Sequence, residues 1–200
     1  MKRTTTRRRR ELKHFVTDNR RLFPFVGLFV AGVAAGVAVY TAARDQIPAR
    51  LVTLSPVPAG IGGWLTALGG GCFSVLCLLA ALFLFGLWGC GAPFILAVPL
   101  FHGLGVGMTE AHYYSLGWGG VATVAAAVMP VGLLTAVVLA AAGAQSLRMS
   151  VGLTRRLLGG ESTADTKDFR LYCLRFLIFV AAAVAVGILD VLIRGLLLPH

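Results

Sequence analysis

The chain has 200 residues, of which 58% are hydrophobic and only 13% are charged, and its mean hydropathy is +0.84. A soluble domain rarely carries so little charge. The apolar residues fall in blocks of about twenty, the length that crosses a bilayer as a helix. A transmembrane β-barrel would instead alternate polar and apolar residues over segments of about ten. The composition therefore predicts an all-α, polytopic membrane protein.

The net charge of +10 comes mainly from two basic regions, one before the first apolar block and one near the C-terminal third of the chain. Basic residues that flank membrane spans fix orientation and contact anionic lipid. This placement predicts membrane lipids, and not nucleic acid, as their partners. Residues 1–21 are accordingly predicted to be a basic cytoplasmic N-terminal segment.

Residues 22–200 are predicted to form a single integral membrane domain. The expected spans are about 22–43, 64–88, 92–110, 120–147 and 171–194, with a cytoplasmic loop at 148–170. The first apolar run exceeds a usual signal-peptide core, so we expect it to be retained as a span. The apolar run that follows is too long for one crossing and must fold back near Pro93, which suits a first helical turn. Because both basic regions should be cytoplasmic, five crossings place the C-terminus outside.

Small residues recur inside these spans at helical spacing. Gly32 and Gly36 form a G-x-x-x-G pattern in the first span, and Gly103, Gly105 and Gly107 lie in the third. Such residues let the backbones of membrane helices approach closely. The pattern predicts close helix packing, and it permits a homo-oligomer without requiring one.

His102 is an ionisable residue inside the third span, one turn after Pro99. Ionisable residues at membrane depth are costly and are candidate functional residues by default. A proline frees a backbone carbonyl, so the imidazole N–H could bond that carbonyl or a neighbouring helix. A role in a proton or ion relay is the alternative interpretation.

Four further ionisable residues lie near the predicted outer boundary. Asp190 and Arg194 are four residues apart on one helix face and are expected to pair. Glu110 and His112 are two residues apart, so they should point to different faces and form an interfacial polar pair. In the fourth span Pro130 predicts a kink, which would serve either as a hinge or in packing. Each of these residues is a candidate for a structural role or for contact with a partner.

The sequence lacks the motifs of the common enzymes. It contains neither H-E-x-x-H nor G-x-S-x-G. The glycines after His102 follow no strand, which excludes a phosphate-binding loop. None of the four cysteines belongs to a C-x-x-C pair. We therefore expect no catalytic residue, no metal and no cofactor.

Residues 91–150 resemble the stage II sporulation protein M family. The similarity rests on the order and spacing of three features: the polar residue and glycines of 102–107, an aromatic outer loop, and the segment Met129-Pro130-Val131-Gly132 followed by a small-residue helix up to Arg148. The basic entry into the first span and the count of five spans also agree with this family.

The resemblance implies a non-enzymatic scaffold in endospore formation. Such a protein would anchor peptidoglycan-remodelling hydrolases, the stage II sporulation proteins D and P, during septal thinning and engulfment. It would reside in the cytoplasmic membrane, on the mother-cell side of the septum. The alternative hypothesis is a membrane subunit of a transporter or channel, with broken helices around His102.

Overall fold

The computed structural model describes residues 22–48, 51–54, 60–159 and 166–197. Within these ranges the chain forms helices and no strand, and five stretches are long and apolar enough to cross a membrane. The expected all-α, polytopic membrane architecture is therefore confirmed. The elements are α2 (Phe23–Ala43), η1 (Arg44–Gln46), α3 (Ile61–Leu87), α4 (Ala92–Tyr114), α5 (Trp118–Thr123), the π-helical turn η3 (Val124–Val128), α6 (Met129–Gly159) and α7 (Thr166–Leu197).

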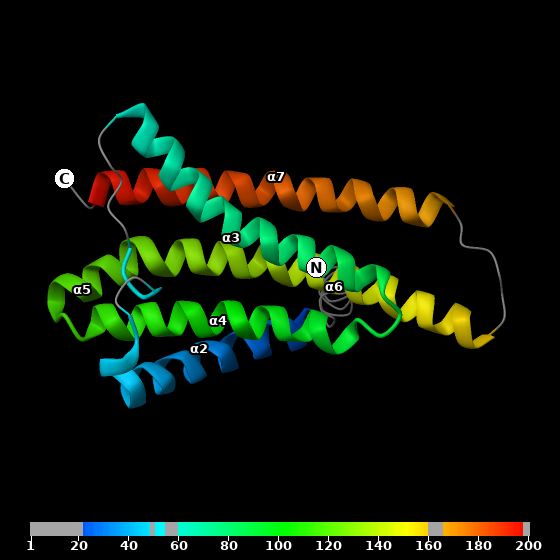
Figure 1. Cartoon of the computed structure of the whole chain (residues 1–200), viewed down its shortest axis with the longest axis horizontal. Coiled ribbons are helices and arrows are strands. Elements are labelled where there is room, and N and C mark those ends of the chain that lie inside the picture. The colour runs from blue at the N-terminus through cyan, green and yellow to red at the C-terminus, as the bar shows by residue number, and fades with distance from the viewer. Residues whose placement is uncertain (1–21, 49–50, 55–59, 160–165, 198–200) are drawn as a thin grey trace, which may run out of the picture.

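The helices run back and forth along one long axis (Figure 1). The ends of α2, α4 and α7 and the starts of α3 and α5 all lie at the same end of the molecule, which we name the outer end after the predicted orientation. Aromatic residues lie on these helix ends, among them Tyr40, Trp64, Tyr114 and Trp118, as is common where membrane helices meet the lipid headgroups. Trp88, which follows the last residue of α3, belongs to the opposite, inner end.

The predicted cytoplasmic loop 148–170 is mostly helical. Helix α6 continues to Gly159 and α7 begins at Thr166, so only residues 160–165, outside the described part, separate them. Hydropathy marks where a helix leaves the apolar layer, not where its backbone hydrogen bonds stop. Here α6 continues beside the α3–α4 turn, where Ser150 Oγ donates to the Trp88 carbonyl at 2.8 Å. Other boundaries shift slightly, with α3 starting at Ile61 and α4 ending at Tyr114. The predicted N-terminal segment 1–21 lies outside the described residues.

The fourth span is interrupted just before Pro130, as the proline predicts. The wide turn η3 precedes it, and the Met129 N–H reaches back five residues to the Val124 carbonyl. A proline lacks the N–H for a helical hydrogen bond and its ring crowds the preceding turn. A π-helical turn is a known way to absorb such a defect inside a helix. The interruption thus falls inside a continuous apolar span, Trp118–Thr154.

Helices α2 and α4 form the closest pair in the bundle. A Cβ added at Gly32 or Gly36 would collide with the carbonyls of Leu100 or Leu104 on α4. Reciprocally, one added at Gly103 would collide with the Phe29 carbonyl on α2. Residue numbers at these contacts increase in the same direction along both helices, so α2 and α4 are parallel. This is the close backbone approach that small residues permit in membranes.

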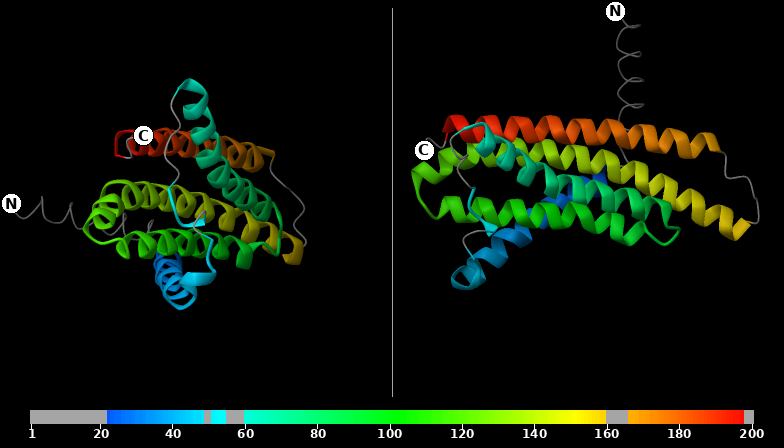
Figure 2. Two further views of the ribbon diagram at one scale, coloured as in Figure 1. Left: turned by 60° about the vertical axis from the view of Figure 1, so that its left-hand side comes forward. Right: turned by 45° about the horizontal axis from the view of Figure 1, so that its top comes forward.

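A second pair consists of α3 and α7. Gly187 on α7 lies against Cys72 of α3, and a Cβ at Gly195 would come within 2.8 Å of the Trp64 ring. Helix α6 contacts both pairs. In Figures 1 and 2, α2 and α7 lie on opposite sides of the layer that α4 and α6 form.

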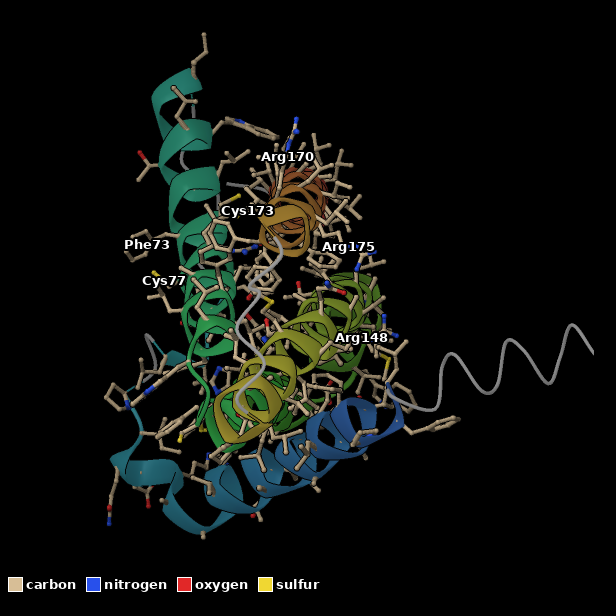
Figure 3. All side chains as sticks on the ribbon, turned by 90° about the vertical axis from the view of Figure 1, so that its right-hand side faces the viewer. Phe73, Cys77, Arg148, Arg170, Cys173 and Arg175 are labelled. Atoms are coloured by element: carbon tan, nitrogen blue, oxygen red, sulfur yellow. The ribbon has the colours of Figure 1, made fainter. Side chains whose placement is uncertain are left out.

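The inner half of the bundle is closely packed. Leu82, Ile95 and Leu139 are fully buried there, and the Tyr172 hydroxyl donates to the Phe83 carbonyl at 3.0 Å. Figure 3 looks onto this end and shows Arg148, Arg170 and Arg175 on α6 and α7. These basic side chains therefore lie at the same, inner end of two spans, as expected for residues at a membrane surface.

Candidate functional site

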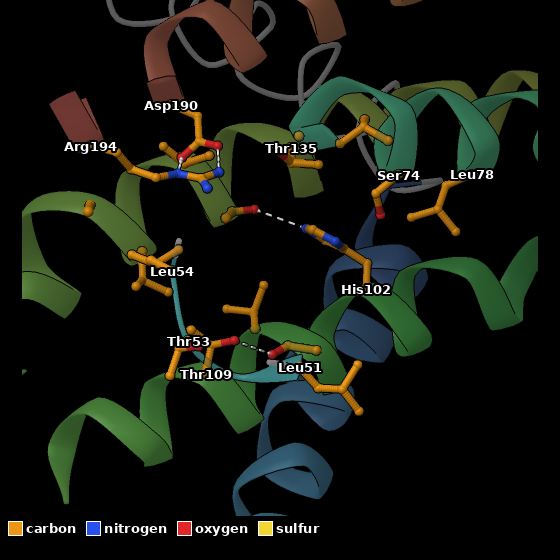
Figure 4. A pocket seen from close by; sticks show the side chains of 18 of the residues that line it. Leu51, Thr53, Leu54, Ser74, Leu78, His102, Thr109, Thr135, Asp190 and Arg194 are labelled. Carbon is orange, nitrogen blue, oxygen red and sulfur yellow. Dashed lines mark hydrogen bonds and ion pairs between the residues drawn. The ribbon is translucent and has the colours of Figure 1, made fainter. Parts of the chain in front are cut away.

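A cavity of about 540 Å³ lies in the outer half of the bundle, between the two helix pairs (Figure 4). Its walls come from the first half of α3, the second half of α4, the region around η3 and Pro130, and the end of α7. Segment 51–54 of the first loop contributes the remaining wall, and the Leu54 N–H donates to the Tyr113 hydroxyl at 2.9 Å. The cavity therefore lies at membrane depth, beneath part of the first outer loop.

His102 is the imidazole in this cavity. Its Nε2 lies 3.4 Å from the carbonyl oxygen of Gly132 on α6, and its ring stacks on Phe29 of α2 with 5.7 Å between the centroids. Of the two partners that the sequence left open, the structure brings His102 to a neighbouring helix. The residue thus connects α2, α4 and α6 at one point.

Asp190 and Arg194 form the predicted ion pair at the opposite wall. The Arg194 Nε donates to Asp190 Oδ1 at 2.8 Å, and a terminal guanidinium nitrogen pairs with Oδ2. Only 17% of the Arg194 side chain and 10% of the Asp190 side chain are exposed. A Cβ added at Gly71 of α3 would lie 3.4 Å from Asp190 Oδ2, so a glycine makes room for the pair. Spacing predicts this pairing, because residues four apart meet on a helix face.

Three hydroxyl side chains on the helices, together with Thr53 of the first loop, complete the polar lining. Thr109 Oγ1 donates to the Gly105 carbonyl at 3.0 Å within α4. Thr135 of α6 is buried and makes no hydrogen bond within the part of the chain that the structure describes. Ser74 of α3 lines the cavity and is itself exposed. The lining therefore offers hydrogen-bonding groups from three helices around one ion pair.

The remaining candidate residues lie outside the cavity. Gly103 and Gly107 are buried against α2 and do not line the cavity. Glu110 is buried, whereas His112 Nδ1 lies 2.9 Å from the Tyr40 hydroxyl at the outer end. Glu110 and His112 thus have different surroundings, in agreement with the different faces that their spacing predicts, whereas the expected interfacial pairing of the two is not seen among the described contacts. Pro130 lies beside the cavity wall without lining it.

Sequence reasoning missed the residues that open the cavity. Ser74 and Thr135 stand singly in apolar spans, and Gly105 stands out in the sequence only as one of three glycines expected to serve helix packing. Hydroxyl residues are common in membrane helices, where they usually bond their own backbone. Only the tertiary arrangement brings these three to one place, so no local signal could have found them.

The arrangement can bind polar groups, but its chemistry is limited. The described residues contain no cluster of three or more His, Cys, Asp or Glu side chains that would hold a metal ion. Among the described residues, the hydrogen-bond partner of the His102 ring is a backbone carbonyl, that of Gly132, and not the side chain of a serine, threonine or cysteine. Comparison of the chain with protein-family models, with curated proteins and with solved structures finds no match.

Proposed function

We propose that this protein is a non-enzymatic membrane scaffold of endospore formation. It anchors peptidoglycan-remodelling hydrolases, the stage II sporulation proteins D and P, in the cytoplasmic membrane on the mother-cell side of the septum. There it acts during septal thinning and engulfment. The proposal begins from the resemblance of residues 91–150 to the stage II sporulation protein M family.

The observation that carries the proposal is an exposed apolar bend at the outer end. Trp118 is 89% exposed at the start of α5, and Leu116 and Tyr114 beside it are exposed as well. Aromatic residues are enriched where proteins meet one another. The bend turns at Gly117, which adopts φ +84°, and Gly120 packs closely on the Tyr113 carbonyl. An exposed apolar bend suits the docking of a membrane-anchored partner.

The ionisable residues of the spans also favour a scaffold. His102, Asp190 and His112 each contact another group of the protein. Side chains held in this way rigidify a bundle. A scaffold needs that rigidity, because it must present a surface of constant shape to its partners.

The proposal is tested by recovering the tagged protein from sporulating cells of its own source in mild detergent. We expect membrane-anchored cell-wall hydrolases among the proteins recovered. Trp118→Ala should lower their recovery at least tenfold, because losing an aromatic hot spot costs about 2 kcal/mol or more and each 1.4 kcal/mol is about tenfold. Trp88→Ala is the matched control, because Trp88 is also exposed but belongs to the inner end. Absence of hydrolases from the wild-type sample would reject the scaffold.

A membrane subunit of a transporter or channel is the second candidate. The cavity of about 540 Å³ favours it, since solute sites of transporters lie at membrane depth beside interrupted helices. The same experiment separates the two candidates. Recovery of an ATPase without any hydrolase would replace the scaffold by the transporter subunit.

A further inference from the structure

We propose that the cavity between α3 and α4 is a lateral binding site for the zwitterionic headgroup of a phospholipid, entering from the outer half of the bilayer. This inference depends neither on the scaffold nor on the transporter hypothesis. It rests on where the cavity opens, on the charges in its lining and on its size.

The cavity opens sideways into the membrane. Phe101 of α4 lines it and is 65% exposed, and Ser74 of α3 lines it and is exposed too. Both residues belong to membrane-spanning stretches. The opening follows from helix pairing, because α3 packs on α7 at Gly195 while α4 packs on α2 at Gly103. The two pairs thus separate toward the outer end and leave a gap that faces lipid.

The charges in the lining are balanced. Asp190 and Arg194 supply one negative and one positive group, and they are the only formally charged side chains among the lining residues that the structure describes. Because these two charges already neutralise each other, a ligand with a single net charge would bring an uncompensated charge into a low-dielectric site, which is costly. A headgroup with one phosphate and one ammonium is neutral overall and offers an opposite charge to both Asp190 and Arg194. The phosphate would bind Arg194 and the ammonium would bind Asp190.

The rest of the cavity matches an amphipathic molecule. Its volume of about 540 Å³ lies within the roughly 300–1,000 Å³ of small-molecule sites. Thr135 lines the same cavity, and its hydroxyl can donate a hydrogen bond to an ester oxygen. Leu78 and Val75 of α3 provide apolar contact where acyl chains would leave toward the bilayer. The polar and apolar parts of the site are therefore arranged like those of a phospholipid.

Glycine 105 offers a way to fill the site without disturbing the bundle. Gly105 lines the cavity, and a Cβ added there would meet no atom within 4 Å. Gly105→Phe should therefore occupy the cavity while α4 keeps its packing on α2. Gly27→Phe is the matched control, since Gly27 on α2 is equally unobstructed and does not line the cavity.

The test uses native mass spectrometry of the full-length protein in mild detergent, with added phosphatidylethanolamine, phosphatidylglycerol or diacylglycerol. We expect one phosphatidylethanolamine to be retained by the wild type and by Gly27→Phe. Gly105→Phe should reduce this retention at least tenfold. Asp190→Asn and Arg194→Gln should each reduce it several-fold, with thermal unfolding confirming that the variants remain folded.

Three results would overturn the proposal. Equal retention of phosphatidylglycerol would show that the site does not select a zwitterion. Equal retention of diacylglycerol would show that the headgroup is not recognised. Unchanged retention in Gly105→Phe would show that the bound lipid is annular and lies outside the cavity. None of these results bears on the recovery of hydrolases, so the two proposals fail separately.

Discussion

Helix α4 has two faces on which glycine has opposite effects. On one face Gly103 and Gly107 touch the backbone of α2, where an added Cβ would collide with the carbonyls of Phe29 and Val33. On the other face Gly105 borders the cavity, and an added Cβ would meet nothing within 4 Å. Helix α4 thus takes part both in the closest helix pair of the bundle and in the wall of the cavity.

The spacing along the helix explains the difference. Residues 103 and 107 are four apart and share a face, whereas residue 105 is rotated about 200° from 103 at about 100° per residue. The same residue type therefore permits close backbone contact in one direction and leaves space in the other. Gly103 and Gly107 therefore serve the contact with α2, whereas Gly105, between them in the sequence, leaves space for the cavity.

A large side chain placed on each face of α4 in turn tests the difference between the two faces. Gly103→Leu or Gly107→Leu should destabilise the protein by about 3 kcal/mol, the upper range for overpacking, because the obstacle is backbone that cannot rotate away. Gly105→Leu should leave stability nearly unchanged. Thermal unfolding in detergent measures both effects. Equal losses for Gly103→Leu and Gly105→Leu would contradict the difference between the two faces.

A second prediction concerns the ion pair at the cavity wall. Asp190→Leu leaves the Arg194 guanidinium without its partner at membrane depth, and we expect a loss of about 2 kcal/mol. This value is below that of a fully buried pair, because 17% of the Arg194 side chain is exposed. The double variant Asp190→Leu/Arg194→Leu removes both charges and should recover most of the loss. A double variant less stable than either single one would show that the pair does not act as a unit.

The smallest expected effect is at His102. Its hydrogen bond to the Gly132 carbonyl is long, at 3.4 Å, and polar bonds between membrane helices average about 0.6 kcal/mol. His102→Leu should therefore lower the free energy of unfolding by about that amount. A loss as large as that of Gly103→Leu, in the same unfolding measurement, would mean that His102 holds α4 and α6 together more strongly than its geometry indicates.

Much of the fold could be predicted because it depends on local properties. Span number follows from hydropathy and length, and the Asp190–Arg194 pair follows from their spacing of four residues. The π-helical turn lies where Pro130 predicts an interruption. The end of α6 at Gly159 could not be predicted, because hydropathy does not report how far a helix continues beyond the apolar layer.

The site was predicted only in part. His102, Asp190 and Arg194 stand out as ionisable residues in apolar spans, and all three line the cavity. Nothing in the sequence indicates that His102 of α4 and the pair on α7 share one space. That proximity results from which helices pair, and glycine patterns alone do not reveal whether a helix packs on its sequence neighbour or on a later one.

The pairing of α2 with α4 has a consequence for how the protein is assembled. Helix α2 packs mainly on α4, yet α3 is synthesised between them. The Gly32–Gly36 face of α2 must therefore wait in lipid, without its partner, until Gly103 and Gly107 have entered the membrane. A chain that stops after α3 would keep this face uncovered. The bundle therefore does not assemble by packing each new span on the one before it. Its first helix gains its main partner only when the third span has been inserted.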